Sequence, residues 1–336
     1  MNRRDAVLAL LAIGATAGLP QVHAQTQQSR GPYRIALLPD FRPSYEPLLK
    51  LFVETLRESG RIEGRDFVFY RSGIIGGQDE ALAVRRVLDQ KPDLIFAANL
   101  GYVIAAHKLT KTIPIVMWIS GFPVEGGVAT SLARPGKNVT GLTIYAGAQV
   151  FGKLVQLLHE AKPSEKRIGA LCTYLPPFHP PEEANPIIQE IREAGRSLGL
   201  AVRILEIAKT EQTSEALATV AAERMDALLL TSGASTFSRR QEIMQFAVAK
   251  RLPTITDFHW PGIEPQPLLS YTPPFSGLIR QATAYVDRIL WGGANPGDLP
   301  IQLPARIELT VNLKTANAIG LTVPQSVLLR ADEVIQ

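Results

Sequence analysis

The chain has 336 residues, of which 35 are basic, 31 are acidic and one is a cysteine. Because the single cysteine, Cys172, cannot form an intrachain disulfide, the fold must depend on its hydrophobic core, and this length suggests two domains of ordinary size. The formal net charge of +4 is mild and no basic tract follows the pattern of a phosphate-backbone binder, which argues against nucleic acid as a partner.

The N-terminal segment has the pattern of a secretory signal peptide. Arg3 and Arg4 precede an apolar run over residues 6–19, small residues follow at 22 and 24, and residues 25–29 are polar. The run is shorter than the about 18 residues that a membrane span needs. We therefore expect residues 1–24 to be the signal peptide, and a periplasmic protein without a lipid anchor, since no cysteine lies near the cleavage point. Sec and twin-arginine export both remain open. A helix that stays in the fold is disfavoured, because the run has no polar face.

From Arg34 onward, short apolar strands alternate with segments of helical spacing. This alternation predicts a parallel sheet covered by helices on both faces. The first unit comprises expected strands at 35–38, 66–70, 94–97, 115–118 and 139–144, with helices at 45–59, 78–90 and 102–110.

After residue 144 the same alternation starts again and predicts a second unit. It comprises helices at 148–160, 185–198, 213–223 and 238–250, and strands at 167–171, 201–205, 227–231 and 254–256. A further helix at 275–291 and a strand at 307–311 are expected to return to the first unit. The predicted fold class is α/β, with two doubly wound, Rossmann-like lobes joined by a hinge. Residues 33–144 plus 272–320 form the first lobe, 145–271 form the second, and 321–336 form a C-terminal segment. The expected crossings lie near Ile144, near Tyr271 and after Pro304.

Ligands of open parallel sheets bind beyond the carboxyl ends of the strands, where loops and helix N-termini converge. The strand ends of both units are rich in hydroxyl groups, glycines and aromatic rings, which suit a small, partly apolar ligand. The candidate ligand-binding residues at these ends are Asp40, Phe41, Asn99, Leu100, Gly101, Ser120, Phe122, Tyr145, Thr173, Tyr174, Ser232, Ser235, Asp257 and Phe258.

Four segments resemble a known family: residues 131–141 (Ser-Leu-Ala-Arg-Pro-Gly-Lys-Asn-Val-Thr-Gly), 284–290, 312–324 and 328–334. They are similar to the substrate-binding proteins of ABC transporters, in the family whose members include tryptophan and tyrosine binders. The resemblance spans residues 33–335. It implies the periplasmic-binding-protein type I architecture, no catalysis, no cofactor and a ligand buried by lobe closure. It also implies an ABC permease of the inner membrane as partner of a monomeric receptor.

The chain departs from this family in the loop after the strand that ends near Ile119. The family usually has Gly-Asp-Pro there, and this chain has Gly121-Phe122-Pro123. An acid in that loop could balance the ammonium group of an amino acid, and Phe122 cannot. We therefore expect an aromatic or planar organic acid, or a neutral relative, rather than an amino acid, unless Asp40 or Asp257 supplies the missing carboxylate.

Other functions have weaker support. Residues 147–153 imitate a phosphate-binding loop, but Leu154 stands where such a loop needs Ser or Thr. His107, His159, His179 and His259 show no metal-ligand spacing, and no nucleophile elbow or dinucleotide fingerprint occurs. A periplasmic enzyme and a ligand sensor for a membrane kinase remain alternatives. Cys172 is expected to be a small buried apolar residue.

Overall fold

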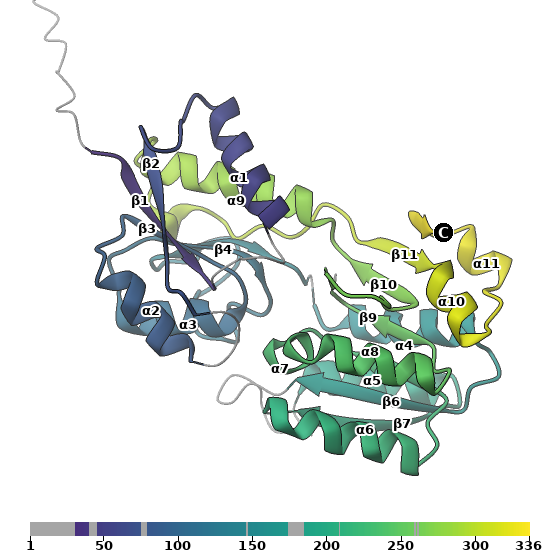
Figure 1. Ribbon diagram of the computed structural model, residues 1–336. Helices are drawn as coiled ribbons and strands as arrows, with labels where there is room; N and C mark the ends of the chain where they lie inside the picture. Colours follow the sequence, from purple (N-terminus) through teal and green to yellow (C-terminus); the bar gives the residue numbers. More distant parts are fainter. Residues whose placement is uncertain are drawn as a thin grey trace, which may run out of the picture. The chain divides into compact units, whose positions relative to one another are not determined.

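The computed structural model describes residues 31–39, 46–74, 79–145, 147–173, 185–207, 209–258, 260 and 262–336 (Figure 1). The expected signal peptide and three candidate site residues, Asp40, Phe41 and Tyr174, lie outside these residues. The described residues contain two sheets, and each sheet with its helices is called a lobe below.

The first sheet has five parallel strands in the order β2-β1-β3-β4-β5. The strands are β1 (Tyr33–Leu38), β2 (Phe67–Arg71), β3 (Leu94–Ala97), β4 (Ile115–Ser120) and β5 (Val139–Thr143). Every residue of β3, β4 and β5 is buried. This explains why these strands are almost continuous apolar runs in the sequence: a parallel sheet is covered on both faces.

Successive side chains of β1 enter two different hydrophobic cores. Ile35 and Leu37 contact the core under α1 (Glu46–Glu58), whereas Ala36 and Leu38 contact the core under α2 (Glu80–Leu88) and α3 (Leu100–Leu109). Adjacent residues of a strand point to opposite faces, so one strand serves both cores.

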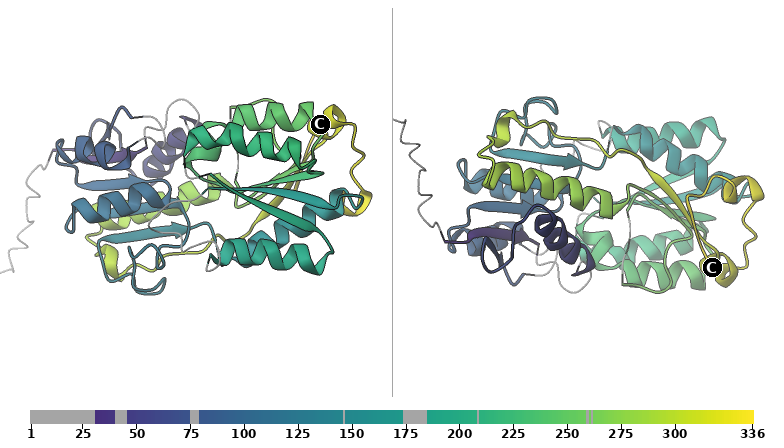
Figure 2. Two further views of the ribbon diagram at one scale, coloured as in Figure 1. Left: turned by 90° about the horizontal axis from the view of Figure 1, so that it is seen from below. Right: turned by 90° about the horizontal axis from the view of Figure 1, so that it is seen from above.

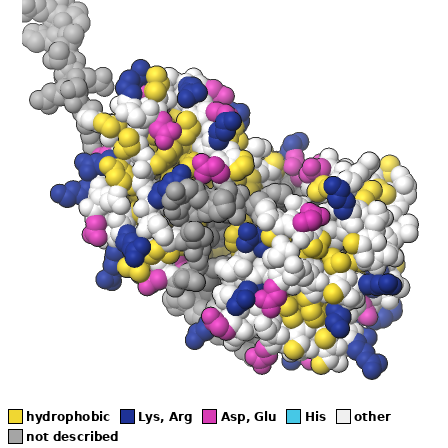
Figure 3. Space-filling model, viewed as in Figure 1, with side chains coloured by type: hydrophobic (Ala, Val, Ile, Leu, Met, Phe, Trp, Pro, Cys, Tyr) yellow, Lys and Arg dark blue, Asp and Glu magenta, His cyan; other side chains and the backbone are white. Residues whose placement is uncertain are grey.

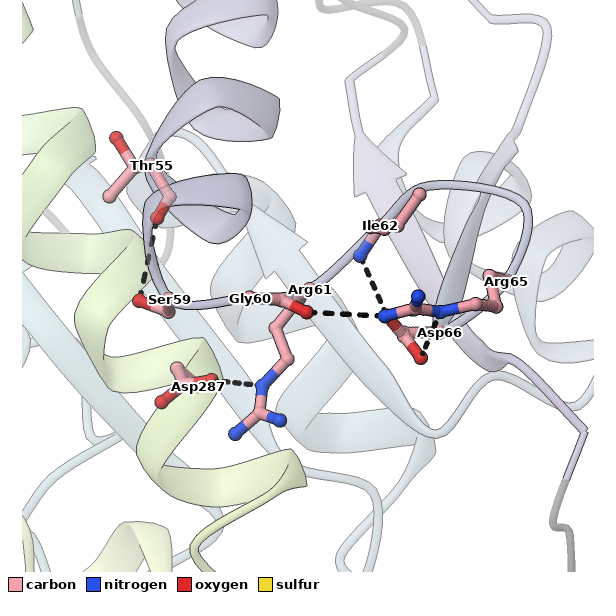
Figure 4. Close-up of polar contacts among 8 residues, drawn as sticks. All are labelled: Thr55, Ser59, Gly60, Arg61, Ile62, Arg65, Asp66 and Asp287. Carbon is pink, nitrogen blue, oxygen red and sulfur yellow. Dashed lines mark hydrogen bonds and ion pairs between the residues drawn. The ribbon is translucent and has the colours of Figure 1, made fainter.

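Helix α9 (Phe275–Leu290) packs beside α1 on the first lobe, as the sequence predicts (Figure 1). The Arg61 Nε atom lies 2.9 Å from Asp287 Oδ1 of α9, and Figure 4 shows the two side chains pointing toward each other. The same guanidinium lies over the Trp291 ring, 4.9 Å from its centroid. The return of α9 to the first lobe therefore combines an ion pair, a cation–π contact and the packing of an amphipathic helix.

The second sheet has seven strands in the order β12-β11-β10-β9-β8-β6-β7. They are β6 (Arg167–Thr173), β7 (Ala201–Ile207), β8 (Ala227–Leu230), β9 (Thr254–Thr256), β10 (Leu269–Thr272), β11 (Glu308–Asn312) and β12 (Glu333–Ile335). Only the pairing of β10 with β11 is antiparallel among them. The helices of this lobe lie on both sides of the sheet (Figure 2). They are α4 (Gln149–Ala161), α5 (Pro186–Ser197), α6 (Thr213–Ala222), α7 (Ala234–Ser238), α8 (Arg240–Ala249), α10 (Leu313–Ile319) and α11 (Gln325–Leu328), with 3-10 turns at Thr210–Gln212 in this lobe and Pro296–Asp298 beside β5.

The position of β11 corrects one expectation from the sequence. The expected strand near 307–311 was assigned to the first lobe, but β11 pairs with β10 and β12 in the second sheet. Leu309 and Val311 enter the second-lobe core together with Phe151 and Leu154 of α4. The C-terminal residues from 313 onward follow β11 into this core through α10, α11 and β12.

Within the described residues, the chain passes between the two lobes at three places. Residues 144–148 connect β5 to α4, and residues 273–274 connect β10 to α9. The third passage follows Gln302, whose backbone still exchanges hydrogen bonds with Thr143 and Gly141 of β5 (2.9 Å each). A fold joined by three crossings permits a change of angle between two otherwise rigid lobes.

Candidate ligand-binding site

The carboxyl edge of the first sheet places Asn99, Leu100 and Gly101 at the start of α3. Asn99 has a left-handed backbone (φ +56°), and its Oδ1 accepts a hydrogen bond from the Tyr102 amide at 3.2 Å. This is an N-cap, which leaves the side-chain Nδ2 group of Asn99 as a donor. The first turn of α3 therefore offers backbone N–H groups and the positive end of a helix dipole.

Ser120 lies next to this helix start, at the end of β4. The Asn99 amide donates to the carbonyl of Ile119 at 3.2 Å, which joins the two strand ends. Ser120 is 1% exposed, and its Oγ has no hydrogen-bond partner among the described residues. A buried hydroxyl without a partner is costly, so Ser120 is suited to bind a polar group that arrives from outside the protein.

Phe122 lies in the loop after β4 and packs against Tyr145. It has a left-handed backbone (φ +52°), which is uncommon for an aromatic residue and is often found at functional sites. Its ring centroid lies 5.3 Å from that of Tyr145, at an interplanar angle of 32°. The Phe122 ring therefore makes an apolar contact with Tyr145 in the loop after β4.

Tyr145, Ser232 and Asp257 form one hydrogen-bonded cluster. The Tyr145 hydroxyl donates to Asp257 Oδ2 and lies 2.7 Å from Ser232 Oγ. Ser232 donates to Asp257 twice, from its amide to Oδ1 at 2.7 Å and from its Oγ to Oδ2 at 3.0 Å. Burial raises the pKa of Asp257 to about 6, although hydrogen bonds from Tyr145 and Ser232 lower it. Burial, followed by the charge of Asp257, also raises the pKa of Tyr145.

The other described candidates of the second lobe are buried, and Phe258 packs against the first lobe. Thr173 Oγ1 lies 3.1 Å from Thr236 Oγ1, and a Cβ atom on Gly233 would come within 2.3 Å of the Thr173 side chain. Ser235 is also buried. Phe258 is 8% exposed, and its ring makes an edge contact with Phe275 of α9 at 4.9 Å.

The structure also brings two charged groups to these strand ends that the sequence analysis missed. A Cβ atom on Gly101 would lie 3.0 Å from Glu80 Oε1, so this carboxylate lies over the start of α3. The Arg240 guanidinium stacks on Phe237, 4.1 Å from the ring centroid, and the Phe237 ring lies 6.1 Å from that of Phe258. Glu80 depends on how α2 packs against α3, which no local pattern reveals. The i, i+3 spacing of Phe237 and Arg240 was the available signal for the stacked pair.

Metal and thiol chemistry find little support among the described residues. No group of three or more His, Cys, Asp or Glu side chains in that part of the chain could hold a metal ion. Cys172 is buried, and burial raises the pKa of its thiol to about 12, which keeps it protonated at neutral pH. None of the helices described is long and apolar enough to cross a membrane. Acidic and basic side chains are interspersed over the face drawn in Figure 3.

Two α/β lobes linked by three crossings, with candidate polar and aromatic groups at their strand ends, define a periplasmic-binding-protein type I fold. Two solved structures share it. A complex of an ABC domain with L-Trp from Streptococcus pneumonia has a TM-score of 0.75 at 21% identity, covering 91% of this chain and 100% of that one. A conserved domain protein from Vibrio cholerae has a TM-score of 0.74 at 22% identity, covering 90% and 99%.

The sequence comparison gives the family. Residues 42–335 match the family described as ABC transporter substrate binding protein. The chain therefore belongs to the ABC transporter substrate-binding protein family, as the four sequence segments indicated. A tyrosine-binding protein of Clostridioides difficile (strain R20291) is 24% identical over 283 residues, which cover 83% of this chain and 78% of that protein.

Proposed function

We propose that this protein is the periplasmic solute-binding component of an ABC uptake transporter. It is not an enzyme: it closes two lobes on a small organic ligand and presents it to a permease of the inner membrane. The ligand is an aromatic or planar organic acid, or a neutral relative, rather than a zwitterionic amino acid. Membership of the substrate-binding family supports the first part of this proposal, and the geometry of Asp257 supports the choice of ligand.

The ligand class is supported by the burial of Asp257 and by the hydrogen bonds that its carboxylate already accepts. Asp257 was one of two acids that could replace the family's usual aspartate as a partner for an ammonium group. The carboxylate is 1% exposed and already accepts three hydrogen bonds, two from Ser232 and one from Tyr145. Burying an ammonium without a partner costs several kcal/mol, a large part of the about 8 kcal/mol that micromolar binding represents.

Groups that suit an anion remain beside the apolar rings. The buried hydroxyl of Ser120 has no hydrogen-bond partner in the described part of the chain, and the adjacent α3 N-terminus favours negative charge. Arg240 adds a positive charge stacked on Phe237, and its Nη1 donates to the Phe237 carbonyl at 2.8 Å. A carboxylate bound by such donors, with its ring against Phe122, matches the chemistry of these residues better than a free amine does.

An aromatic amino acid is the second candidate, because Glu80 favours it. The Glu80 carboxylate lies against Gly101 at the start of α3 and could accept a hydrogen bond from the ammonium group of a ligand. The tyrosine-binding relative and the L-Trp complex have amino-acid ligands by name. The two candidates therefore differ in whether Glu80 or the donors around Ser120 determine the charge of the ligand.

Calorimetry with matched ligand pairs tests the proposal. Tryptophan, tyrosine, phenylalanine and the branched-chain amino acids are each compared with their deaminated acids. We expect at least one acid to bind in the micromolar range, at least about tenfold tighter than its amino acid, which corresponds to about 1.4 kcal/mol. Micromolar binding of any amino acid, with no response to the acids, would contradict this.

Two substitutions separate the candidates. Glu80→Gln removes the carboxylate and keeps the shape, so it should leave acid binding almost unchanged. If the ligand is an amino acid, the same change should weaken binding about tenfold or more, because a hydrogen bond to a charged group contributes about 1.5–3 kcal/mol. Phe122→Asp is the complementary change, because it adds a carboxylate to the site where Glu80→Gln removes one. It should weaken binding of the acid through charge repulsion.

A further inference from the structure

We infer that Tyr145 is a positioning residue that couples the two halves of the ligand site, by holding the loop after β4 of the first lobe against the strand ends of the second. This inference rests on the proposed function in one respect: the two lobes must be able to change their angle. In this inference Tyr145 controls the position of one lobe against the other and does not contact the ligand directly.

The hydroxyl group of Tyr145 is fixed on the second lobe. It donates to Asp257 Oδ2, beyond the end of β9, and lies 2.7 Å from Ser232 Oγ, beyond the end of β8. Asp257 is 1% exposed. A hydrogen bond to a buried carboxylate is among the stronger ones in proteins, so the tyrosine ring is expected to move with the second sheet.

The ring of Tyr145 supports the first lobe. A Cβ atom on Gly121 would lie 2.6 Å from Tyr145 Cδ2 and 2.7 Å from Cε2, so the backbone of Gly121 rests directly on the ring. Phe122 packs against the same ring at 5.3 Å, and Phe151 of α4 packs against it at 5.2 Å. The ring is thus enclosed by groups of both lobes.

The two kinds of contact respond differently to a change of angle. The hydroxyl contacts are directional hydrogen bonds, whereas the contacts with Gly121 and Phe122 are dispersion contacts that tolerate sliding. A glycine at 121 gives the ring a flat backbone surface to slide on. When the lobes move, Tyr145 therefore stays with Ser232 and Asp257 and continues to support the loop 120–122 over a range of lobe angles.

Spin-label distance measurements on the full chain without ligand test this. Labels on cysteines introduced at the exposed positions Arg85 of α2 and Glu215 of α6 report the lobe separation, in a Cys172→Ser background. We expect one narrow distance distribution for the unaltered site. Tyr145→Phe, which keeps the ring and removes the hydroxyl, should add a second population at longer distance. Gly121→Ala, which forces the loop away from the ring, should shift the main population to longer distance.

Tyr285→Phe is the matched control. The Tyr285 hydroxyl donates to the Pro300 carbonyl at 2.5 Å, so this variant also loses one tyrosine hydrogen bond, but away from the lobe contact. Its distribution should coincide with that of the unaltered site. Coincidence of both test variants with the unaltered site, with folding verified by circular dichroism, would overturn the inference. So would a second population in Tyr285→Phe equal to that in Tyr145→Phe. Since no ligand is used, failure to find a transported solute would overturn the proposed function and leave this result standing.

Discussion

The wild-type protein should lose stability as the pH rises from acidic to alkaline values. Replacing Glu165 with glutamine should largely abolish this loss. Glu165 precedes β6, is 0% exposed, and neither of its carboxylate oxygens has a hydrogen-bond partner among the described residues. Burial raises its pKa from 4.5 to about 8, although the charge of Lys162 lowers it. His159 Nδ1 lies 3.6 Å from Glu165 Oε1, and Asp226 adds a repulsive charge.

The direction of the pH effect follows from the raised pKa. The folded protein binds the proton of Glu165 more tightly than the unfolded chain does, so the stabilising contribution is complete below about pH 4.5 and is lost as the pH rises through about 8. At about 1.4 kcal/mol per pKa unit, the loss reaches up to about 5 kcal/mol. Glu165→Gln should therefore be more stable than the wild type at pH 9, and the difference should be much smaller at pH 5.

Urea unfolding of both proteins across this pH range measures the difference. Glu54→Gln on α1 is the control, because it makes the same chemical change at an exposed side chain, where no burial acts on the carboxylate. A difference between wild type and Glu165→Gln that changes by less than about 1 kcal/mol from pH 5 to pH 9 would contradict the assignment of a buried, protonated Glu165.

Gly141→Ala should destabilise the first lobe severely. Gly141 lies in β5, pairs with Met117 of β4 and has φ +122°, a conformation that residues with a side chain rarely adopt. A Cβ atom there would lie 2.0 Å from the Met117 carbonyl oxygen and 2.8 Å from its amide nitrogen. Because both are backbone atoms of a buried strand, they cannot move aside cheaply. We expect a loss of more than about 3 kcal/mol of unfolding free energy.

Gly277→Ala is the matched control for this prediction. Gly277 lies in the first turn of α9, and the nearest atom to its added Cβ is Pro274 Cγ at 3.9 Å. Alanine favours a helix over glycine, so this variant should gain up to about 1 kcal/mol. Denaturant midpoints of the two variants provide the comparison, and equal stability of Gly141→Ala and wild type would show that β4 and β5 are not paired as described.

The sequence predicted the repeated strand-helix alternation well because each buried parallel strand is a short apolar run. It failed at β11, because the sheet that this strand joins depends on tertiary packing, here the pairing with β10 and β12 and the burial of Leu309 and Val311 in the second-lobe core. The sequence also placed Ser232 and Asp257 at strand ends, and the structure adds that these strands, β8 and β9, are neighbours. That these groups hydrogen-bond to each other and to Tyr145 could not be predicted, because side-chain partners depend on how the lobes meet. Phe258 shows the same limit, since its contact with Phe275 arises only when α9 has packed.

Small-angle scattering during ligand titration tests the central claim most directly. A ligand that touches both lobes favours the closed arrangement through its differential contacts. We predict that a ligand whose binding has been established by calorimetry decreases the radius of gyration, with saturation at the same ligand concentration as the heat signal. An unchanged radius at full occupancy would contradict the account of a receptor that closes two lobes on its solute.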